Sequence, residues 1–382
     1  MRRALAALVL VVLAAGGANA RSFAGRFDDR LTEPIAQALA DSIGRSLPVT
    51  SASSGLTFRF DFATSAFERE TDLLGQIYLE RAEPLGRGKL NLAVSWQRVH
   101  FDTVDGRDLD DLRDEGPPIV DPQSGLLVAV PRFGIDLDVQ EITTSITYGL
   151  TDAIDVNLTL PVLTSGFDVD AVARNVSQGG TQPGRIDDRA VGVGDLFLRG
   201  KYRFARGRVG SLATGFVLRL PAGNEDDFQG TGTFEVSPFL YASTTRLELG
   251  GGLRLQGYLN AGFDIVTTDA SRSEFRFGGG LDLGVRDWLT LAVAVLGREP
   301  FSRLAPPGAF DVARVDPRTG QRSVSPLFGL DLGRPQYYEL SLGGRLELWR
   351  DTLFLTGNVL LPITDDGFRA SIVPLVGLEA VF

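Results

Sequence analysis

A strict alternation of apolar and polar residues between Val191 and Pro221 most constrains what this chain can fold into. From residue 196 to 204, leucine, tyrosine and phenylalanine recur at even positions, while Arg199, Lys201 and Arg203 occupy successive odd positions. A period of two residues suits a β-strand. The pattern resumes after a short turn at 205–208 and includes Arg219. The two stretches predict a β-hairpin with an oily face and a charged face, which suits a membrane barrel with lipid outside and water inside.

The first twenty residues have the composition of a secretory signal peptide. Arg2 and Arg3 precede an apolar run at 4–15, and Ala18-Asn19-Ala20 forms a small-residue cleavage site. The apolar run is too short for a good membrane-spanning helix. We therefore expect cleavage after Ala20 and localisation of the mature chain in a bacterial outer membrane.

Composition excludes several function classes. The formal net charge is -10, which argues against a nucleic-acid partner. The chain has no cysteine, so it has neither disulfides nor thiolate chemistry, and no motif predicts a cofactor or a metal site. No later segment offers eighteen uninterrupted apolar residues, and the 45 glycines and 19 prolines fit a chain of many strands and turns.

The predicted fold class is all-β: a transmembrane antiparallel up-and-down barrel of about 14 strands, with a short N-terminal helical or irregular segment. Counts of 12 or 16 stay open. Tight turns follow the even strands, and long segments at 102–134, 164–190 and 299–335 follow odd ones, as in barrels with short periplasmic turns. The strands are expected at about 55–63, 73–82, 88–101, 135–149, 153–163, 191–205, 208–220, 231–243, 246–260, 273–286, 287–298, 336–349, 352–362 and 369–382.

This pattern divides the chain into a signal peptide at 1–20, an N-terminal segment at 21–54 and the barrel at 55–382. Thr32 is a candidate N-cap for a short helix ending at Gly44. The N-terminal segment is either a periplasmic lead-in or a plug folded into the lumen.

Short motifs recur along the predicted strands: Gly149-Leu150-Thr151-Asp152, Leu160-Pro161, Gly192-Val193-Gly194-Asp195-Leu196, Lys201-Tyr202-Arg203-Phe204 and Leu220-Pro221-Ala222-Gly223. Over roughly 73–382 they resemble outer-membrane transporters of the phenol-degradation meta-pathway type, which are distantly similar to the long-chain fatty-acid transporter barrels. The resemblance implies a channel for passive uptake of small hydrophobic or aromatic compounds. The alternating last strand, which ends on Phe382, resembles the signal read by the barrel-assembly machinery. Outer-membrane lipid and lipopolysaccharide are the other expected partners.

The strand register predicts a set of charged side chains that line the lumen. Both signs occur, so the set either lines a water-filled path or cross-links neighbouring strands into a rigid interior. Its members are Arg199, Lys201, Arg203, Arg219, Arg254, Asp282, Glu339 and Arg345.

Three prolines lie at the outer ends of predicted strands: Pro161, Pro221 and Pro362. Each removes a ladder donor, so it either ends its strand or weakens the wall enough for a lateral gap. The single histidine, His100, lies at the outer rim beside Asp102, which leaves a rim enzyme that hydrolyses lipid or peptide as an alternative. A purely structural barrel is a third reading. No residue is predicted to be catalytic.

Overall fold

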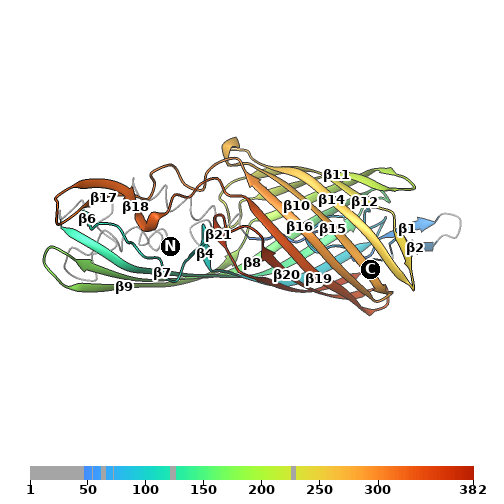
Figure 1. Cartoon of the computed structure of the whole chain (residues 1–382). Coiled ribbons are helices and arrows are strands. Elements are labelled where there is room, and N and C mark those ends of the chain that lie inside the picture. Colours follow the sequence, from blue (N-terminus) through green and yellow to red (C-terminus); the bar gives the residue numbers. More distant parts are fainter. Residues whose placement is uncertain (1–46, 54, 62–65, 72, 121–125, 225–228) are drawn as a thin grey trace.

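Twelve strands pair edge to edge into a closed antiparallel barrel (Figure 1). The computed structural model describes residues 47–53, 55–61, 66–71, 73–120, 126–224 and 229–382. The predicted signal peptide and the helix expected between Thr32 and Gly44 lie outside these residues. The barrel strands are β3 (Leu90–Phe101), β7 (Leu127–Gly149), β8 (Ile154–Asn175), β10 (Leu196–Arg206), β11 (Gly210–Leu220), β12 (Glu235–Thr244), β14 (Leu253–Val266), β15 (Glu274–Arg286), β16 (Leu289–Pro300), β19 (Tyr337–Trp349), β20 (Leu353–Pro362) and β22 (Val373–Val381).

The barrel closes between its last strand and its first. β22 pairs antiparallel with β3, and the Phe382 N–H donates to the Leu90 carbonyl at 2.8 Å. A closed ladder leaves no unpaired edge, which is the condition for strands to cross lipid. The all-β barrel predicted from the alternation is confirmed.

The two faces of the wall differ as the alternation predicts. On β10, Leu198 and Tyr202 are 41% and 49% exposed on the outside, while Lys201 is 8% exposed on the inside. Trp288 and Trp349 are exposed at the end where β15 meets β16 and β19 meets β20. An apolar outer band bordered by aromatic residues is the arrangement of a membrane barrel. Within the described residues, no helix is long and apolar enough to cross a membrane.

The predicted count of fourteen strands is wrong, because the first two candidates are not in the wall. β1 (Phe58–Asp61) pairs only with β2 (Ala66–Arg69), and the described part of 73–82 contains no strand. The first wall strand begins at Leu90, not at residue 55. Leu73, Leu74 and Ile77 are all buried, so this stretch has no lipid face. Alternation in a segment surrounded on every side does not report a wall strand.

The three segments predicted as long outer loops contain strands instead. β7 and β8 continue beyond the membrane part of the barrel, and β9 (Thr181–Val193) pairs along β8 (Figure 1). Three more short strands extend this sheet: β6 (Ile119–Val120) and the hairpin of β17 (Asp311–Val315) and β18 (Arg322–Pro326). The strand order is β18-β17-β6-β7-β8-β9. Backbone groups outside the membrane are thus satisfied by pairing rather than by irregular loops.

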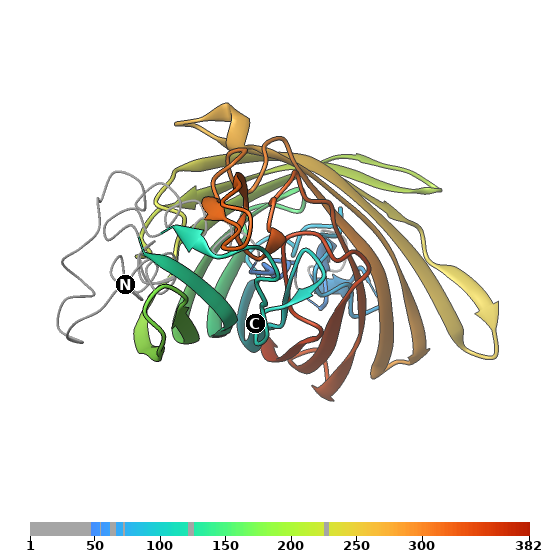
Figure 2. The same cartoon turned by 60° about the vertical axis from the view of Figure 1, so that its left-hand side comes forward.

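The outer ends of the strands carry a cap, defined here as residues 102–120, 301–336 and 363–372. It contains the small sheet of β4 (Thr103–Val104), β5 (Arg107–Asp108) and β21 (Phe368–Arg369), and the short helix η4 (Leu327–Gly329). Figure 2 shows these segments gathered over the outer end of the barrel. Phe133 of β7 stacks on Phe328 with ring centroids 5.2 Å apart. The cap therefore closes the outer mouth with an apolar core rather than with solvated loops.

Two further elements lie elsewhere on the barrel rim. β13 (Leu247–Gly250) folds back on β14 at the short-turn end, and the helix η3 (Ala270–Arg272) joins β14 to β15 at the outer end.

A buried ion pair holds the cap together. Arg314 on β17 is 1% exposed and donates to both carboxylate oxygens of Asp114, at 2.7 and 2.8 Å. Its guanidinium also donates to the carbonyls of Pro117 and Pro326. One side chain therefore joins the β3–β7 connection to both strands of the β17–β18 hairpin.

Replacing this arginine tests the role of the pair. Arg314→Met leaves the Asp114 carboxylate buried without its cation, so we expect the cap to lose about 3–5 kcal/mol of stability. Hydrogen exchange at 311–326 measures that loss, and the exposed Arg322→Met on β18 is the matched control. Equal exchange in the two variants would show that the pair does not stabilise the cap.

Candidate functional site

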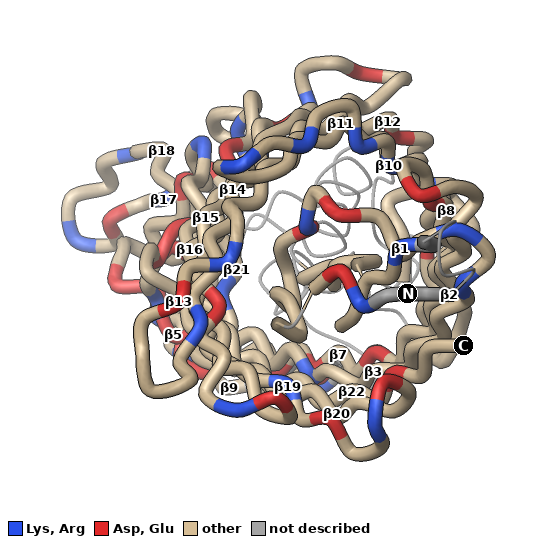
Figure 3. Tube along the Cα trace, turned by 90° about the vertical axis from the view of Figure 1, so that its right-hand side faces the viewer, with Lys and Arg blue, Asp and Glu red and all other residues tan. Residues whose placement is uncertain are grey.

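The described part of residues 47–89, called here the lumen segment, runs through the interior of the barrel (Figure 3), except for the hairpin of β1 and β2, which projects from the short-turn end (Figure 1). Its backbone is bound by side chains of the wall. The Leu74 N–H donates to Thr290 Oγ1 at 3.1 Å, and the Ala82 N–H donates to Ser243 Oγ at 2.8 Å. Polar residues on the inner faces of β16 and β12 thus supply the partners that a neighbouring strand would supply in a sheet.

The side chain of Asn260 on β14 pairs with the backbone of the lumen segment as a neighbouring strand would. Its Oδ1 accepts from the Glu80 N–H at 2.7 Å, and its Nδ2 donates to the Glu80 carbonyl at 2.8 Å. One side-chain amide therefore satisfies both backbone groups of a single residue. The lumen segment is anchored at Glu80 by the wall.

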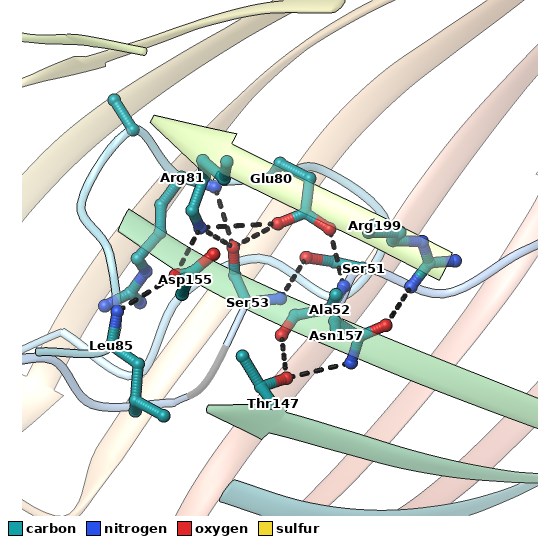
Figure 4. Close-up of polar contacts among 12 residues, drawn as sticks. Ser51, Ala52, Ser53, Glu80, Arg81, Leu85, Thr147, Asp155, Asn157 and Arg199 are labelled. Carbon is teal, nitrogen blue, oxygen red and sulfur yellow. Dashed lines mark hydrogen bonds and ion pairs between the residues drawn. The ribbon is translucent and has the colours of Figure 1, made fainter. Parts of the chain in front are cut away.

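The same residue is anchored through its side chain (Figure 4). The Glu80 carboxylate accepts from the Ala52 N–H and the Ser53 hydroxyl. Lys201 Nζ lies 3.7 Å from Glu80 and 3.5 Å from Asp155, and donates to Ser53 Oγ at 3.1 Å. A cation on β10 therefore joins the lumen segment to a carboxylate on β8.

The eight residues predicted to line the lumen all lie on inward strand positions, and they make three kinds of contact. Four contact the lumen segment: Lys201 as described, Arg203 with Glu70 at 2.8 Å, Arg345 with the Leu74 carbonyl at 2.6 Å, and Asp282 with Gln76 at 2.6 Å. Arg254 pairs with Asp287 of the β15–β16 turn at 2.9 Å.

The other three predicted residues, Arg199, Arg219 and Glu339, line an internal cavity of about 130 Å³. The cavity lies between the lumen segment and the inner faces of β10, β11, β12, β14, β15, β16 and β19. Aromatic side chains alternate there with charged ones. Phe239 and Tyr241 stack with centroids 5.8 Å apart and planes 8° apart.

The wall is irregular where β9 meets β10. On β8, Val162 pairs with Val193 of β9 and Thr159 pairs with Phe197 of β10, so three steps on one strand match four on the other. The Pro161 carbonyl accepts from the Gly194 N–H at 2.9 Å at this shift. We call the wall around Gly194 and Asp195 the wall break.

Two of the three predicted prolines flank the wall break. Pro161 lies on β8 at the shift, and Pro221 directly follows Leu220, the last residue of β11, which pairs with Leu196. The pairing of β10 with β11 ends at this pair, so β11 does not continue alongside β9. Pro362 lies elsewhere, at the outer end of β20, where it pairs with Glu339.

A buried carboxylate that the sequence reasoning did not select organises the wall break. The Asp195 side chain is 0% exposed and pairs with Arg219 at 2.8 Å. It also accepts from the Gly223 N–H at 3.1 Å and from the N–H and hydroxyl of Thr231 at 2.9 and 3.1 Å. Asp195 therefore fastens both described ends of the β11–β12 connection against the wall.

Asp195, Asn260 and Glu80 were missed for different reasons. Asn260 lies on an inward position of β14, so the strand parity alone was sufficient to find it. Asp195 lies at the shift, where parity fails, and Glu80 lies in a segment wrongly placed in the wall. Only tertiary contacts identify the last two.

The rim histidine is surrounded by carboxylates. His100 lies 3.5 Å from Asp102, 3.5 Å from Asp136 and 3.8 Å from Asp138. Its Nδ1 makes no hydrogen bond with any described residue. No group of three or more potential ligands among those residues is arranged to hold a metal ion.

Comparison with known proteins identifies architecture only. No protein-family model and no curated protein match the chain. Among solved structures, it is similar to an outer membrane channel from Pseudomonas putida, at 16% identity over 79% of this chain and 98% of that one, with a TM-score of 0.45. It is also similar to a FadL homologue from Pseudomonas aeruginosa, at 10% identity over 78% of this chain and 90% of that one, with a TM-score of 0.32. A further similar structure is the CymD monoaromatic hydrocarbon channel, at 8% identity over 78% of this chain and 89% of that one, with a TM-score of 0.34.

The likeness to outer-membrane transport channels predicted from the motifs is thus matched among solved structures. At these identities and TM-scores it carries no information on substrate or activity. The chain's own geometry defines its class: a transmembrane β-barrel of outer-membrane type whose interior is occupied by its own N-terminal residues.

The anchor at Glu80 makes a prediction about pH. Burial alone would raise the pKa of Glu80, but Lys201, Arg199 and the bonds from Ser53 and Ala52 outweigh it and lower that pKa. A lowered pKa means that the stabilisation is complete above the ordinary glutamate value of about 4.3 and is lost only as pH falls below it.

We therefore expect the Glu80 contribution to holding the lumen segment to be complete from neutral pH down to about 5 and to be lost in stronger acid, where protease access to the segment rises. Glu80→Gln is expected to show raised access at neutral pH and a weaker acid dependence. Matching acid profiles in the native chain and this variant would exclude Glu80 as the titrating anchor.

Proposed function

We propose that the protein is an outer-membrane channel for passive uptake of small hydrophobic or aromatic compounds, matured by cleavage after Ala20. The lumen segment acts as the plug of this channel, because its bonds to the wall obstruct a straight aqueous path.

The observation that carries the proposal is the position of the cavity beside the wall break. Phe197 and Arg219 both line the cavity, and Arg219 pairs with Asp195 at the break. Leu196 and Leu220, the last paired residues of β10 and β11, border the same place. A hydrophobic solute in the cavity would thus reach lipid sideways, by opening the wall break between Pro161 and Pro221, without crossing the rest of the lumen. Pro362 borders no such break and is not part of this path.

Membrane partners belong to the same proposal. The exposed apolar band contacts lipid, and the outer extension of β7, β8 and β9 reaches the level of lipopolysaccharide. Phe382 is 59% exposed at the seam between β22 and β3, which suits its recognition by the assembly machinery.

A channel is favoured over the rim enzyme by the setting of His100. The charged groups within 3.8 Å of His100 are three carboxylates, and its Nδ1 makes no hydrogen bond with any described residue, whereas a general base must be hydrogen-bonded to a nucleophile or water. A purely structural barrel would not require the internal cavity. His100→Ala is accordingly expected to leave uptake unchanged.

A reversible lock of the wall break tests the proposal. A Cβ on Gly192 would lie 2.1 Å from Gln229 Oε1, so the two positions face each other across β9 and the β11–β12 connection, and the lock places a cysteine at each. The native chain has no cysteine to interfere. We expect the oxidised pair to lower uptake of toluene into cells about tenfold or more, and a reductant to restore it, because the lateral path is closed only while the disulfide holds.

Each single cysteine variant serves as the control, since it carries the side-chain change without the cross-link. Undiminished toluene uptake by the fully cross-linked protein would exclude the lateral path.

A further inference from the structure

The internal cavity contains one arginine that differs from the others. Arg219 lies 2.8 Å from Asp195, Arg276 lies 3.0 Å from Asp264, and Arg298 lies 3.7 Å from Glu274. Arg199 has no carboxylate within 4.0 Å anywhere in the described chain. It is partly exposed, and its inward position on β10 directs that exposure to the cavity.

The hydrogen bonds of Arg199 are few and long. Its Nη1 donates to Asn157 Oδ1 at 3.4 Å and to Thr159 Oγ1 at 3.3 Å (Figure 4 shows the first). Asn157 Oδ1 has a closer donor, because the Thr159 hydroxyl donates to it at 2.8 Å. A guanidinium has five N–H donors in a planar fork. Most of the donor capacity of Arg199 is therefore available to a molecule in the cavity.

The acidic groups of the cavity are already occupied. Glu80 is held by Lys201 and by two hydrogen bonds from the lumen segment, and Asp264 by Arg276. Glu339 accepts from Arg369 at 3.1 Å. The hydrogen-bonding capacity left in the cavity is thus that of a donor and a cation, which selects an anionic group over an amine.

The rest of the cavity wall near Arg199 is aromatic. The Arg199 and Arg219 guanidinium carbons lie 5.6 and 5.5 Å from the centroid of the Phe197 ring, and the stacked rings of Phe239 and Tyr241 line the same cavity. A volume of about 130 Å³ is close to that of an engineered apolar cavity known to bind benzene, of about 150 Å³. One six-membered ring is the size of ligand that it fits.

We propose that this cavity is a binding site for a small aromatic monocarboxylate, with the carboxylate on the Arg199 fork and the ring against Phe197, Phe239 and Tyr241. A planar carboxylate matches a guanidinium through two parallel hydrogen bonds. The inference deepens the proposed function, since it names the compounds that the channel takes up most readily, and it rests on that function for its biological meaning. Binding itself is testable without transport.

The test is isothermal titration calorimetry on the full chain in detergent, with benzoate and with benzamide, its uncharged analogue of similar shape. We expect benzoate to bind at least about tenfold more tightly than benzamide, the discrimination typical of a hydrogen bond to a charged group. Arg199→Gln should abolish that preference, while Arg199→Lys should keep part of it, because the charge stays and the fork is lost.

The matched control is Arg208→Gln, which removes the same charge from the turn between β10 and β11, away from the cavity. It should leave the preference at the native level. Equal affinity of the native chain for the two ligands, no measurable benzoate binding, or equal losses in Arg199→Gln and Arg208→Gln would each overturn the proposal.

Toluene uptake separates this inference from the proposed function. Toluene has no carboxylate, so Arg199→Gln should take it up at the native rate if the protein is a channel for hydrophobic compounds. A native chain that binds benzoate selectively yet takes up neither compound would argue against the channel and leave the binding site standing.

Discussion

The structure depends on one constraint: polar groups inside the barrel have neither lipid nor bulk water to face, so they must bind one another. The backbone polar groups of the wall are paired because β22 closes on β3. The inward polar residues of the wall then need partners across the lumen, and the lumen segment provides them. Asn260 and Lys201 bind Glu80 through its backbone and its side chain. The occupied lumen is thus a consequence of the polar lining and not an addition to it.

The same constraint explains where the molecule departs from regularity. At the shift between β9 and β10 the ladder loses its match with β8, and the buried carboxylate of Asp195 supplies the missing acceptor for groups from three places in the chain. A wall held there by side-chain bonds opens at lower cost than a continuous ladder, because fewer backbone bonds break. The lateral path proposed above uses this part of the wall.

Charge placement separates support from recognition within one lining. Lys201, Arg203 and Arg345 each meet a carboxylate or carbonyl of the lumen segment, so their positive charge is compensated and their role is to hold the structure. Arg199 occupies the neighbouring inward position on β10, yet its hydrogen-bond acceptors are neutral and distant. The carboxylate whose charge acts on it, Glu80, already accepts hydrogen bonds from the lumen segment. Arg199 and Lys201 are two residues apart in the sequence, and both direct a positive charge into the barrel. Their roles differ because the fold places different groups opposite them.

The sequence by itself determined the barrel class, the inward position of Arg199, Lys201 and Arg203, and the sorting of short and long connections, because a two-residue period and the turns are local properties. It did not determine the strand count, since residues 55–89 alternate without a lipid face. Nor did it show the outer part of β8, the strand β9 or the buried contacts of Asp195. Those depend on which residues meet across the lumen and across the wall, and only the closed tertiary structure decided that.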